Sequence, residues 1–266
     1  MIQFKLWRTV GAAALLGASV ACTPVAEKAE TAAPAPEAAG EAGEAASGES
    51  GGEHGEAGVA TAYAGLEGPA RTALGLQHLK GFVLVARQVA EVGTQEEAGA
   101  LVGQGLLEVY TPAQDQFGGF NAAPVQAAEA AGMDAKPKRE LAAKLDAAVR
   151  AISAAQAPLH ANPADLAVRM IDLSTGLYGN VVKTDFVDPI EYQHSLGAAL
   201  SARDALVSGA GALRARDAAR YDEALGELNR FVALWPQPTA PEAPTPNRDV
   251  LAQASRAKLA LSGFLD

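Results

Sequence analysis

Signals for helix starts and stops recur along residues 59–266 and constrain the fold more than any other feature of this chain. Asn162 and Asp188 each stand directly before a proline, and a capping side chain followed by proline is typical of a first helical turn. Thr94 and Glu97 have the spacing of a capping box, in which each side chain bonds an amide freed at the helix start. A chain punctuated in this way is expected to build its core from helices.

Apolar residues recur at helical spacing between these signals, and no stretch shows the alternation typical of a strand. Ala, Leu and Val dominate, and aromatic residues make up only 5% of the chain, which also favours helices. We predict an all-α antiparallel bundle of seven or eight helices. A helical solenoid is the lesser alternative, because no repeat of fixed period is present. The predicted helices lie near residues 69–92, 95–110, 124–131, 137–157, 163–182, 189–207, 217–235 and 248–263, the last of them capped by Asn247.

The first 21 residues have the pattern of a secretory signal peptide. Lys5 and Arg8 precede an apolar run over residues 10–20, and small residues lead into Cys22. The apolar run is about half of the roughly 20 residues that a membrane-spanning helix needs. We therefore expect a cleaved signal over residues 1–21 and not a membrane anchor.

Cys22 is the single cysteine of the chain. Ser19-Val-Ala-Cys22 resembles the lipobox of bacterial lipoproteins, although that family usually has Leu where this chain has Ser19. The resemblance implies that Cys22 is acylated, that the chain contacts the membrane through this lipid, and that Thr23 directs it to the periplasmic face of the outer membrane. The alternative is ordinary cleavage after Ala21, which would leave Cys22 as a free thiol in an oxidising compartment.

Residues 22–58 are predicted to be a disordered acidic linker that begins at the lipidated cysteine. From Thr23 to Gly58 the composition is almost entirely Ala, Gly, Glu, Pro and Ser, too poor in apolar residues to offset the entropy of ordering. The stretch holds eight Glu and one Lys, which accounts for −7 of the formal net charge of −10. Residues 59–266 are therefore the expected helical-bundle domain and are only mildly acidic.

Few residues have the pattern of a chemical site. Glu191 and His194 stand at i and i+3 of a predicted helix, which is half of the pattern that holds two irons in helical bundles. The alternative for Glu191 is stabilisation of the helix start, where a carboxylate is favourable. Glu108 and His78 are weaker candidates, each with a structural alternative, on an exposed face or in a hydrogen bond. No nucleophile, phosphate-loop or zinc-protease motif is present, and the charge excludes a nucleic-acid footprint, so we predict neither an enzyme nor a resident cofactor.

Several short segments resemble bacterial all-helical periplasmic lipoproteins that are distantly similar to imelysin-like, metal-associated proteins. The matching segments are Gly52-Glu-His-Gly-Glu56, Leu79-Lys-Gly-Phe-Val-Leu-Val85, Leu107-Glu-Val-Tyr110 and Glu191-Tyr-Gln193. The resemblance implies a helical bundle with a role in metal or envelope biology. Where it leads us to expect metal-binding His or Glu side chains, this sequence has Phe82, Gln88, Gln104 and Gly105, so only Glu108 and Glu191 remain of that pattern.

These observations predict a non-enzymatic periplasmic lipoprotein that acts as a binding or scaffold module at the outer membrane. Its partner would be an envelope protein or an apolar ligand. The alternative is an imelysin-like component of iron, zinc or copper acquisition that uses Glu191, His194, Glu108 and His78. That alternative requires these four side chains to meet inside the bundle.

Overall fold

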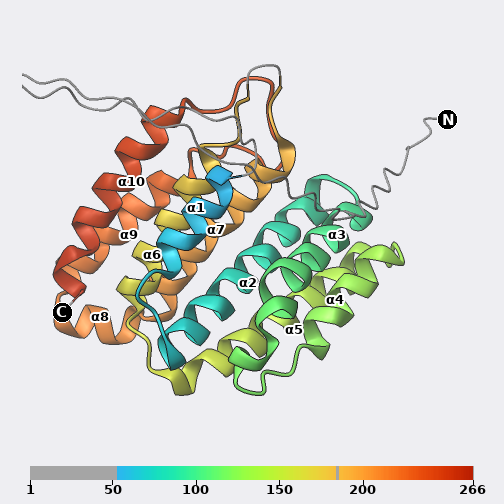
Figure 1. The fold of residues 1–266 in the computed structure, drawn as a ribbon, viewed down its shortest axis with the longest axis horizontal. Coiled ribbons are helices and arrows are strands. Elements are labelled where there is room, and N and C mark those ends of the chain that lie inside the picture. Colours follow the sequence, from blue (N-terminus) through green and yellow to red (C-terminus); the bar gives the residue numbers. More distant parts are fainter. Residues whose placement is uncertain (1–52, 184–185, 266) are drawn as a thin grey trace, which may run out of the picture. The chain divides into compact units, whose positions relative to one another are not determined.

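The structure is a computed structural model and describes residues 53–183 and 186–265 (Figure 1). The chain divides into two units at residues 48 and 49, and the described residues belong to the second unit. The predicted signal peptide, Cys22 and nearly all of the predicted linker lie outside the described residues. No helix in the described part is long and apolar enough to cross a membrane.

The described residues form ten α-helices and no multi-residue strand, which confirms the all-α bundle. A single antiparallel bridge joins Val182 and Val187. The helices are α1 (Glu53–Tyr63), α2 (Gly68–Val92), α3 (Gln95–Gly105), α4 (Ala123–Met133), α5 (Lys138–Gln156), α6 (Pro163–Tyr178), α7 (Pro189–Ser208), α8 (Ala210–Arg216), α9 (Ala218–Val232) and α10 (Asn247–Leu261). A π-helical turn, η1 (Leu106–Tyr110), and a 3₁₀ segment, η2 (Thr111–Phe117), continue α3, while short 3₁₀ turns follow α5 and α10 as η3 (Ala157–Leu159) and η4 (Ser262–Phe264).

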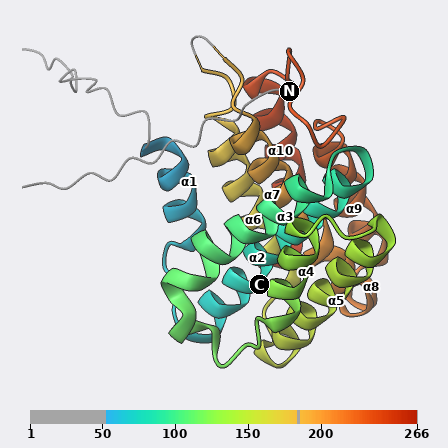
Figure 2. The same cartoon turned by 90° about the vertical axis from the view of Figure 1, so that its right-hand side faces the viewer.

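Eight of the helices form two rings of four, which lie on opposite sides in Figure 1 and one behind the other in Figure 2. In the first ring α2 packs on α3, α3 on α4, α4 on α5, and α5 returns to α2. In the second ring α6 packs on α7, α7 on α9, α9 on α10, and α10 returns to α6. The two rings meet mainly where α2 packs against α7, and α1 lies along the outside of α6.

The α2–α7 contact is close because each helix presents a glycine to the other. A Cβ added to Gly81 would lie 2.9 Å from the carbonyl oxygen of Gly197, and one added to Gly197 would lie 2.8 Å from that of Gly81. Next to this crossing, the Lys80 ammonium is 2.8 Å from the Asp204 carboxylate, and the Lys80 side chain is only 1% exposed. A buried charge pair with a hydrogen bond holds one register between two helices more strictly than apolar contacts do.

The local predictions hold where the sequence supplied a complete cap. Thr94 and Glu97 form the capping box, the Asn162 side chain accepts a hydrogen bond from the Ala164 amide, and Asp188 accepts from the Ile190 and Glu191 amides. Asn247 is a correction, because it is the first residue of α10 and makes no capping bond. The N-cap position of α10 is occupied instead by Pro246, which lies directly before Asn247.

Two helices were not predicted from the sequence. α8 follows α7 directly after Gly209, and its seven residues are too few to show a clear apolar period. α1 begins at Glu53, so the expected junction between linker and domain, at residues 58 and 59, falls inside this helix. Its docking depends on Gly58, which lies against the backbone of Gly176 in α6, and on Arg169, whose Nη1 donates to the Ala62 carbonyl at 2.8 Å.

Candidate functional site

The largest mixed polar and apolar cavity in the described part lies between α1, α2, α6, α7 and the η1–η2 segment. Its volume is about 670 Å³, within the range of small-molecule sites. Apolar atoms from every one of these elements line it, at Val59, Gly75, Val109, Pro112, Ala113, Phe117, Leu177 and Ile190. Its ionisable side chains are Tyr63, Arg71, His78, Glu108, Glu191 and His194. All four residues predicted as candidate ligands therefore line one cavity, although α2, η1 and α7 bring them from distant parts of the sequence.

Glu108 reaches the cavity because the helix widens at η1. The Leu106 carbonyl accepts bonds from both the amide and the hydroxyl of Thr111, five residues along, so the chain carries an extra residue in this turn. π-turns of this kind are rare and are often found at functional sites. Gly105 lets the end of α3 approach α2, since a Cβ there would lie 2.8 Å from Phe82. The Glu108 side chain is 48% exposed, and partial burial raises the pKa of its carboxyl.

Glu191 lies in the first turn of α7, but it does not cap the helix. Asp188 accepts the hydrogen bonds from the amides there, including that of Glu191 itself. The Glu191 Oε2 atom is buried and has no hydrogen-bond partner, the single such side-chain atom among the described residues. Burial raises the pKa of the Glu191 carboxyl, and the negative charges of Asp188 and Glu108 raise it further, while Lys183 acts in the opposite direction.

His194 lies one turn along α7 from Glu191, and its side chain is 8% exposed. Its Nε2 is 3.1 Å from Gln104 Oε1; with the Gln104 amide in this orientation, Nε2 donates the hydrogen bond and Nδ1 keeps its lone pair. Nδ1 faces Glu108 Oε2 at 3.9 Å, which is too long for a hydrogen bond. Burial lowers the pKa of His194 to about 4, so the imidazole is neutral near pH 7.

His78 belongs to the same wall but has a partner of its own. Its Nδ1 lies 3.2 Å from the Tyr63 hydroxyl, which joins α1 to α2 across the cavity. Burial, with a smaller contribution from the charge of His194, lowers the pKa of His78 to about 3. The Phe82 ring lies between the two histidines, with ring centroids 5.5 Å from His78 and 4.8 Å from His194.

The four predicted ligands share a cavity without forming a ready metal centre. No three His, Cys, Asp or Glu side chains of the described residues come close enough together to hold one ion. Phe82 stands between the two histidines at a position where the family resemblance led us to expect a histidine. Of these candidate ligands, His194 and Glu108 approach each other, with His194 Nδ1 3.9 Å from Glu108 Oε2.

Three residues that matter to the cavity were not among the candidates. Tyr63 bonds His78, and Gln104 fixes the ring of His194. Arg71 lies at the cavity mouth over the Tyr63 ring, where its Nε donates to Gln116 Oε1 at 2.9 Å. Tyr63 and Arg71 carry no pattern in the sequence, because only the packing of α1 on the bundle places them here.

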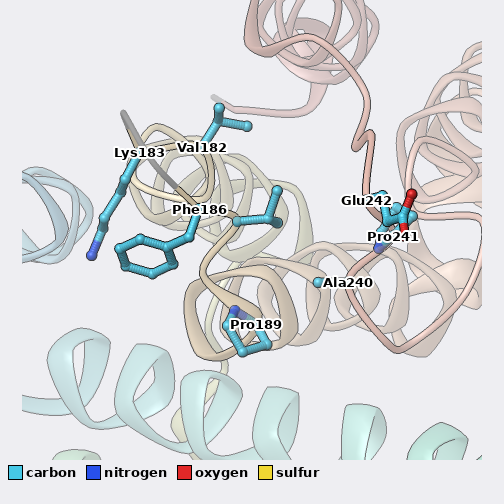
Figure 3. Close-up of a pocket in the computed structure, with 8 residues that line it drawn as sticks. Val182, Lys183, Phe186, Pro189, Ala240, Pro241 and Glu242 are labelled. Atoms are coloured by element: carbon cyan, nitrogen blue, oxygen red, sulfur yellow. The ribbon is translucent and has the colours of Figure 1, made fainter.

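A second hollow lies between the turn after α6 and the chain after α9, as Figure 3 shows. Lys183 and Phe186 stand on one side, and Pro241 and Glu242 stand across from them (Figure 3). The Lys183 ammonium is already bound, 3.0 Å from the Asp188 carboxylate. With its cation paired and no cluster of unpartnered polar atoms, this hollow is the weaker candidate.

Comparisons with protein-family models, with curated proteins and with solved structures found no match to this chain. The resemblance to imelysin-like lipoproteins therefore stays a prediction from short motifs. The candidate site is defined by its own geometry alone.

Proposed function

We propose that this protein is a non-enzymatic binding protein and that its ligand occupies the cavity between α1, α2, α7 and the η1–η2 segment. The observation that carries the proposal is the buried, unpartnered Oε2 of Glu191 in the cavity wall. An unpaired buried acceptor costs about 1–3 kcal/mol of stability in protein mutational data. Such a cost is typical of a site that is completed by a ligand.

Binding is favoured over catalysis by the composition of the cavity wall. The lining contains no serine or cysteine, and the hydroxyl of Thr72, its one aliphatic alcohol, donates to the Gln116 carbonyl at 2.6 Å. The hydroxyl that lies beside a histidine in this lining is that of Tyr63, 3.2 Å from His78 Nδ1, and burial raises the pKa of this phenol, which disfavours its use as a nucleophile. The wall instead combines fixed acceptors with apolar surface, the combination expected of a binding pocket.

We further propose that the protein works at the periplasmic face of the outer membrane, attached through a lipid on Cys22. Thirty residues separate Cys22 from Glu53, where α1 begins. A flexible chain of that length has a root-mean-square reach of about 30 Å. Because α1 forms one wall of the cavity, this arrangement would hold the binding site near the membrane surface without fixing its orientation.

The ligand is tested by recovering it with the protein. The full chain is purified from cells and analysed by native mass spectrometry for a bound small molecule. Ala60 lines the cavity from α1, so Ala60→Trp should fill the space and abolish the extra mass, whereas Ala70→Trp, on exposed surface at the start of α2, should retain it. An extra mass that persists in Ala60→Trp, or no extra mass in any preparation, would argue against the proposal.

Metal binding is the second candidate, because Glu108, Glu191, His78 and His194 line the same cavity. A metal ion would require Glu108 or Glu191 to move, since no three ligands are gathered at one point in the described part. The test is elemental analysis of the purified full chain, with iron, zinc and copper titrations. Near-stoichiometric metal that disappears in Glu191→Ala and His194→Ala would establish this function, and its absence at micromolar metal would remove it.

A further inference from the structure

The inner wall of the cavity holds hydrogen-bond acceptors without matching donors. Glu191 Oε2 has no partner, and the lone pair of His194 Nδ1 faces the Glu108 carboxylate at 3.9 Å. An ionised carboxylate and a neutral imidazole nitrogen can only accept hydrogen bonds. Glu191 Oε2 therefore lacks a donor from the protein, and Glu108 and His194 line the same cavity.

The protein's own cations are engaged elsewhere. Burial raises the pKa of Glu191 and the charge of Lys183 acts against this, but the Lys183 ammonium is itself bound to the Asp188 carboxylate at 3.0 Å. Lys80 is bound to Asp204 on a different face of α2. Arg71 lies over the Tyr63 ring, and its Nε donates to Gln116 Oε1 at 2.9 Å. Of these three cations, Lys183 is the one that acts on Glu191, and it does so while bound to Asp188.

The remaining surface of the cavity is apolar and large. Val59, Val109, Phe117, Leu177 and Ile190 line it, and its volume of about 670 Å³ far exceeds that of a single ion. Metal ions also require several ligands at one point, which the described residues do not supply. The donor is therefore expected to belong to an organic molecule with an apolar body.

We propose that the cavity binds an organic ammonium compound, with its positively charged nitrogen on the side lined by Glu108, Glu191 and His194 and its apolar body against the walls from α1, α6 and η2. This inference rests on the proposed binding function and names the chemical class of the ligand. A primary ammonium is a charged group with three hydrogen-bond donors, which the carboxylates of this side can accept. Hydrogen bonds between charged groups are stronger than neutral ones, so the charge should dominate recognition.

The neutral state of the histidines supports this assignment. Burial lowers the pKa of both His78 and His194 well below 7, so neither ring competes with a ligand cation by carrying its own charge. Burial raises the pKa of the Glu191 and Glu108 carboxyls, and the charge of Lys183 offsets this only in part at Glu191. A bound ammonium would supply further positive charge.

The test compares probes that share one apolar body. Isothermal titration of the full chain at pH 7 uses hexylamine, 1-hexanol and hexanoate, which differ only in the head group. We expect hexylamine to bind at least tenfold more tightly than 1-hexanol and hexanoate not to bind. Glu191→Gln keeps the size of the side chain and should weaken hexylamine binding at least tenfold while leaving 1-hexanol unchanged. Glu223→Gln, at an exposed position on α9, is the matched control and should change neither.

The outcomes separate this inference from the proposed function. Equal affinity for hexylamine and 1-hexanol, or hexylamine binding that survives Glu191→Gln, would overturn ammonium recognition and leave a ligand-binding cavity. No hexylamine binding up to about 10 mM would also overturn it. In either case the native mass spectrometry of Ala60→Trp, which does not depend on the class of ligand, decides whether the cavity binds a ligand at all.

Discussion

At the scale of single residues, the cavity contains ionisable side chains whose burial lowers the stability of the folded protein. Glu191 occupies the first turn of α7, where a carboxylate is favourable to the helix, yet one of its oxygens is buried without a partner. His78 and His194 are held neutral by burial. Each of these groups has a pKa that differs from its value in water, and this difference can be measured as a dependence of stability on pH.

Replacing Glu191 by glutamine should raise the stability of the free protein. The pKa of Glu191 is raised in the folded state, so its carboxyl favours folding at low pH and loses that contribution as the pH rises through the folded pKa. At pH 7 the Glu191→Gln variant should be more stable by on the order of 1 kcal/mol, because a neutral amide costs less to bury than an ionised carboxylate. Below pH 4 the difference should vanish. Urea unfolding at pH 7 and pH 4 measures it, and a variant less stable at pH 7 would contradict the prediction.

The two buried histidines should make the protein less stable as the pH falls from 6.5 towards 4. In this range the unfolded chain binds protons on His78 and His194, whereas the native rings, with pKa values of about 3 and 4, do not. The free energy of unfolding should therefore fall by up to about 1.4 kcal/mol per pH unit for each histidine.

The variants His78→Gln and His194→Gln separate the contribution of the histidines to the pH dependence of stability from that of the carboxyls, which has the opposite sign. Each should flatten the decline in unfolding free energy measured between pH 6.5 and 4.5. His160 lies exposed in the turn after α5, so His160→Asn is the control and should leave the slope unchanged. A slope unaffected by His78→Gln would mean that His78 is protonated in the native protein.

At the scale of elements, pairs of glycines set how closely the helices approach. Gly81 faces Gly197 between α2 and α7, Gly58 faces Gly176 between α1 and α6, and Gly99 faces Gly132 between α3 and α4. At each crossing a Cβ on one helix would meet the backbone of the other. Backbone cannot move aside as a flexible side chain can, so these crossings tolerate no larger residue without separating the helices.

Gly81→Ala should destabilise the protein although alanine is the better helix former. The new methyl would meet the Gly197 carbonyl at the contact between the two rings, and overpacking of this kind costs about 1–3 kcal/mol. Gly226 in α9 is the matched control, because a Cβ there meets nothing within 4 Å. Gly226→Ala should stabilise by about 0.5–1 kcal/mol. Thermal and urea unfolding of both variants test the prediction, which fails if they shift in the same direction.

At the scale of the whole molecule, the two four-helix rings meet mainly where α2 packs against α7, and the cavity lies beside this contact. α2 and α7 belong to different rings and carry His78 and His194 respectively, while η1 carries Glu108. The cavity walls therefore depend on the register between the rings. α1, which follows the predicted linker, closes a further side.

The predicted attachment through Cys22 is tested on the intact chain in a bacterium. Cys22→Ala should abolish labelling by a radioactive fatty acid and move the protein from the outer-membrane fraction to the soluble periplasmic fraction. The helical content measured by circular dichroism should be unchanged, because the described bundle begins thirty residues later. Retention of the variant in the membrane fraction would argue against the lipid anchor.

Most of the secondary structure could be predicted because helix ends are local. Thr94, Asn162 and Asp188 bond amides only two or three residues away, so their effect is visible in the sequence itself. α8 escaped prediction because it is shorter than two apolar periods. α1 escaped because its composition continues that of the linker, and its docking comes from Gly176 and Arg169 in a distant helix.

The candidate site could be predicted only in part. The i and i+3 spacing of Glu191 and His194 placed both on one helix face, and that face does line the cavity. The partners of these residues could not be found in this way, since Gln104 lies ninety residues from His194, and Tyr63 joins His78 only through the packing of α1. The sequence also suggested a capping role for Glu191 that Asp188 performs.

The sequence by itself determined the helical class of the fold, most helix boundaries and the four ionisable residues of interest, because each of these depends on interactions within a few residues. The tertiary structure alone decided that these four residues share one cavity, that Glu191 Oε2 lacks a partner, and that Phe82 separates the two histidines. The physical reason is that burial and pairing depend on which helix faces are brought together. At the crossing of α2 and α7, these faces can meet because Gly81 and Gly197 carry no side chains.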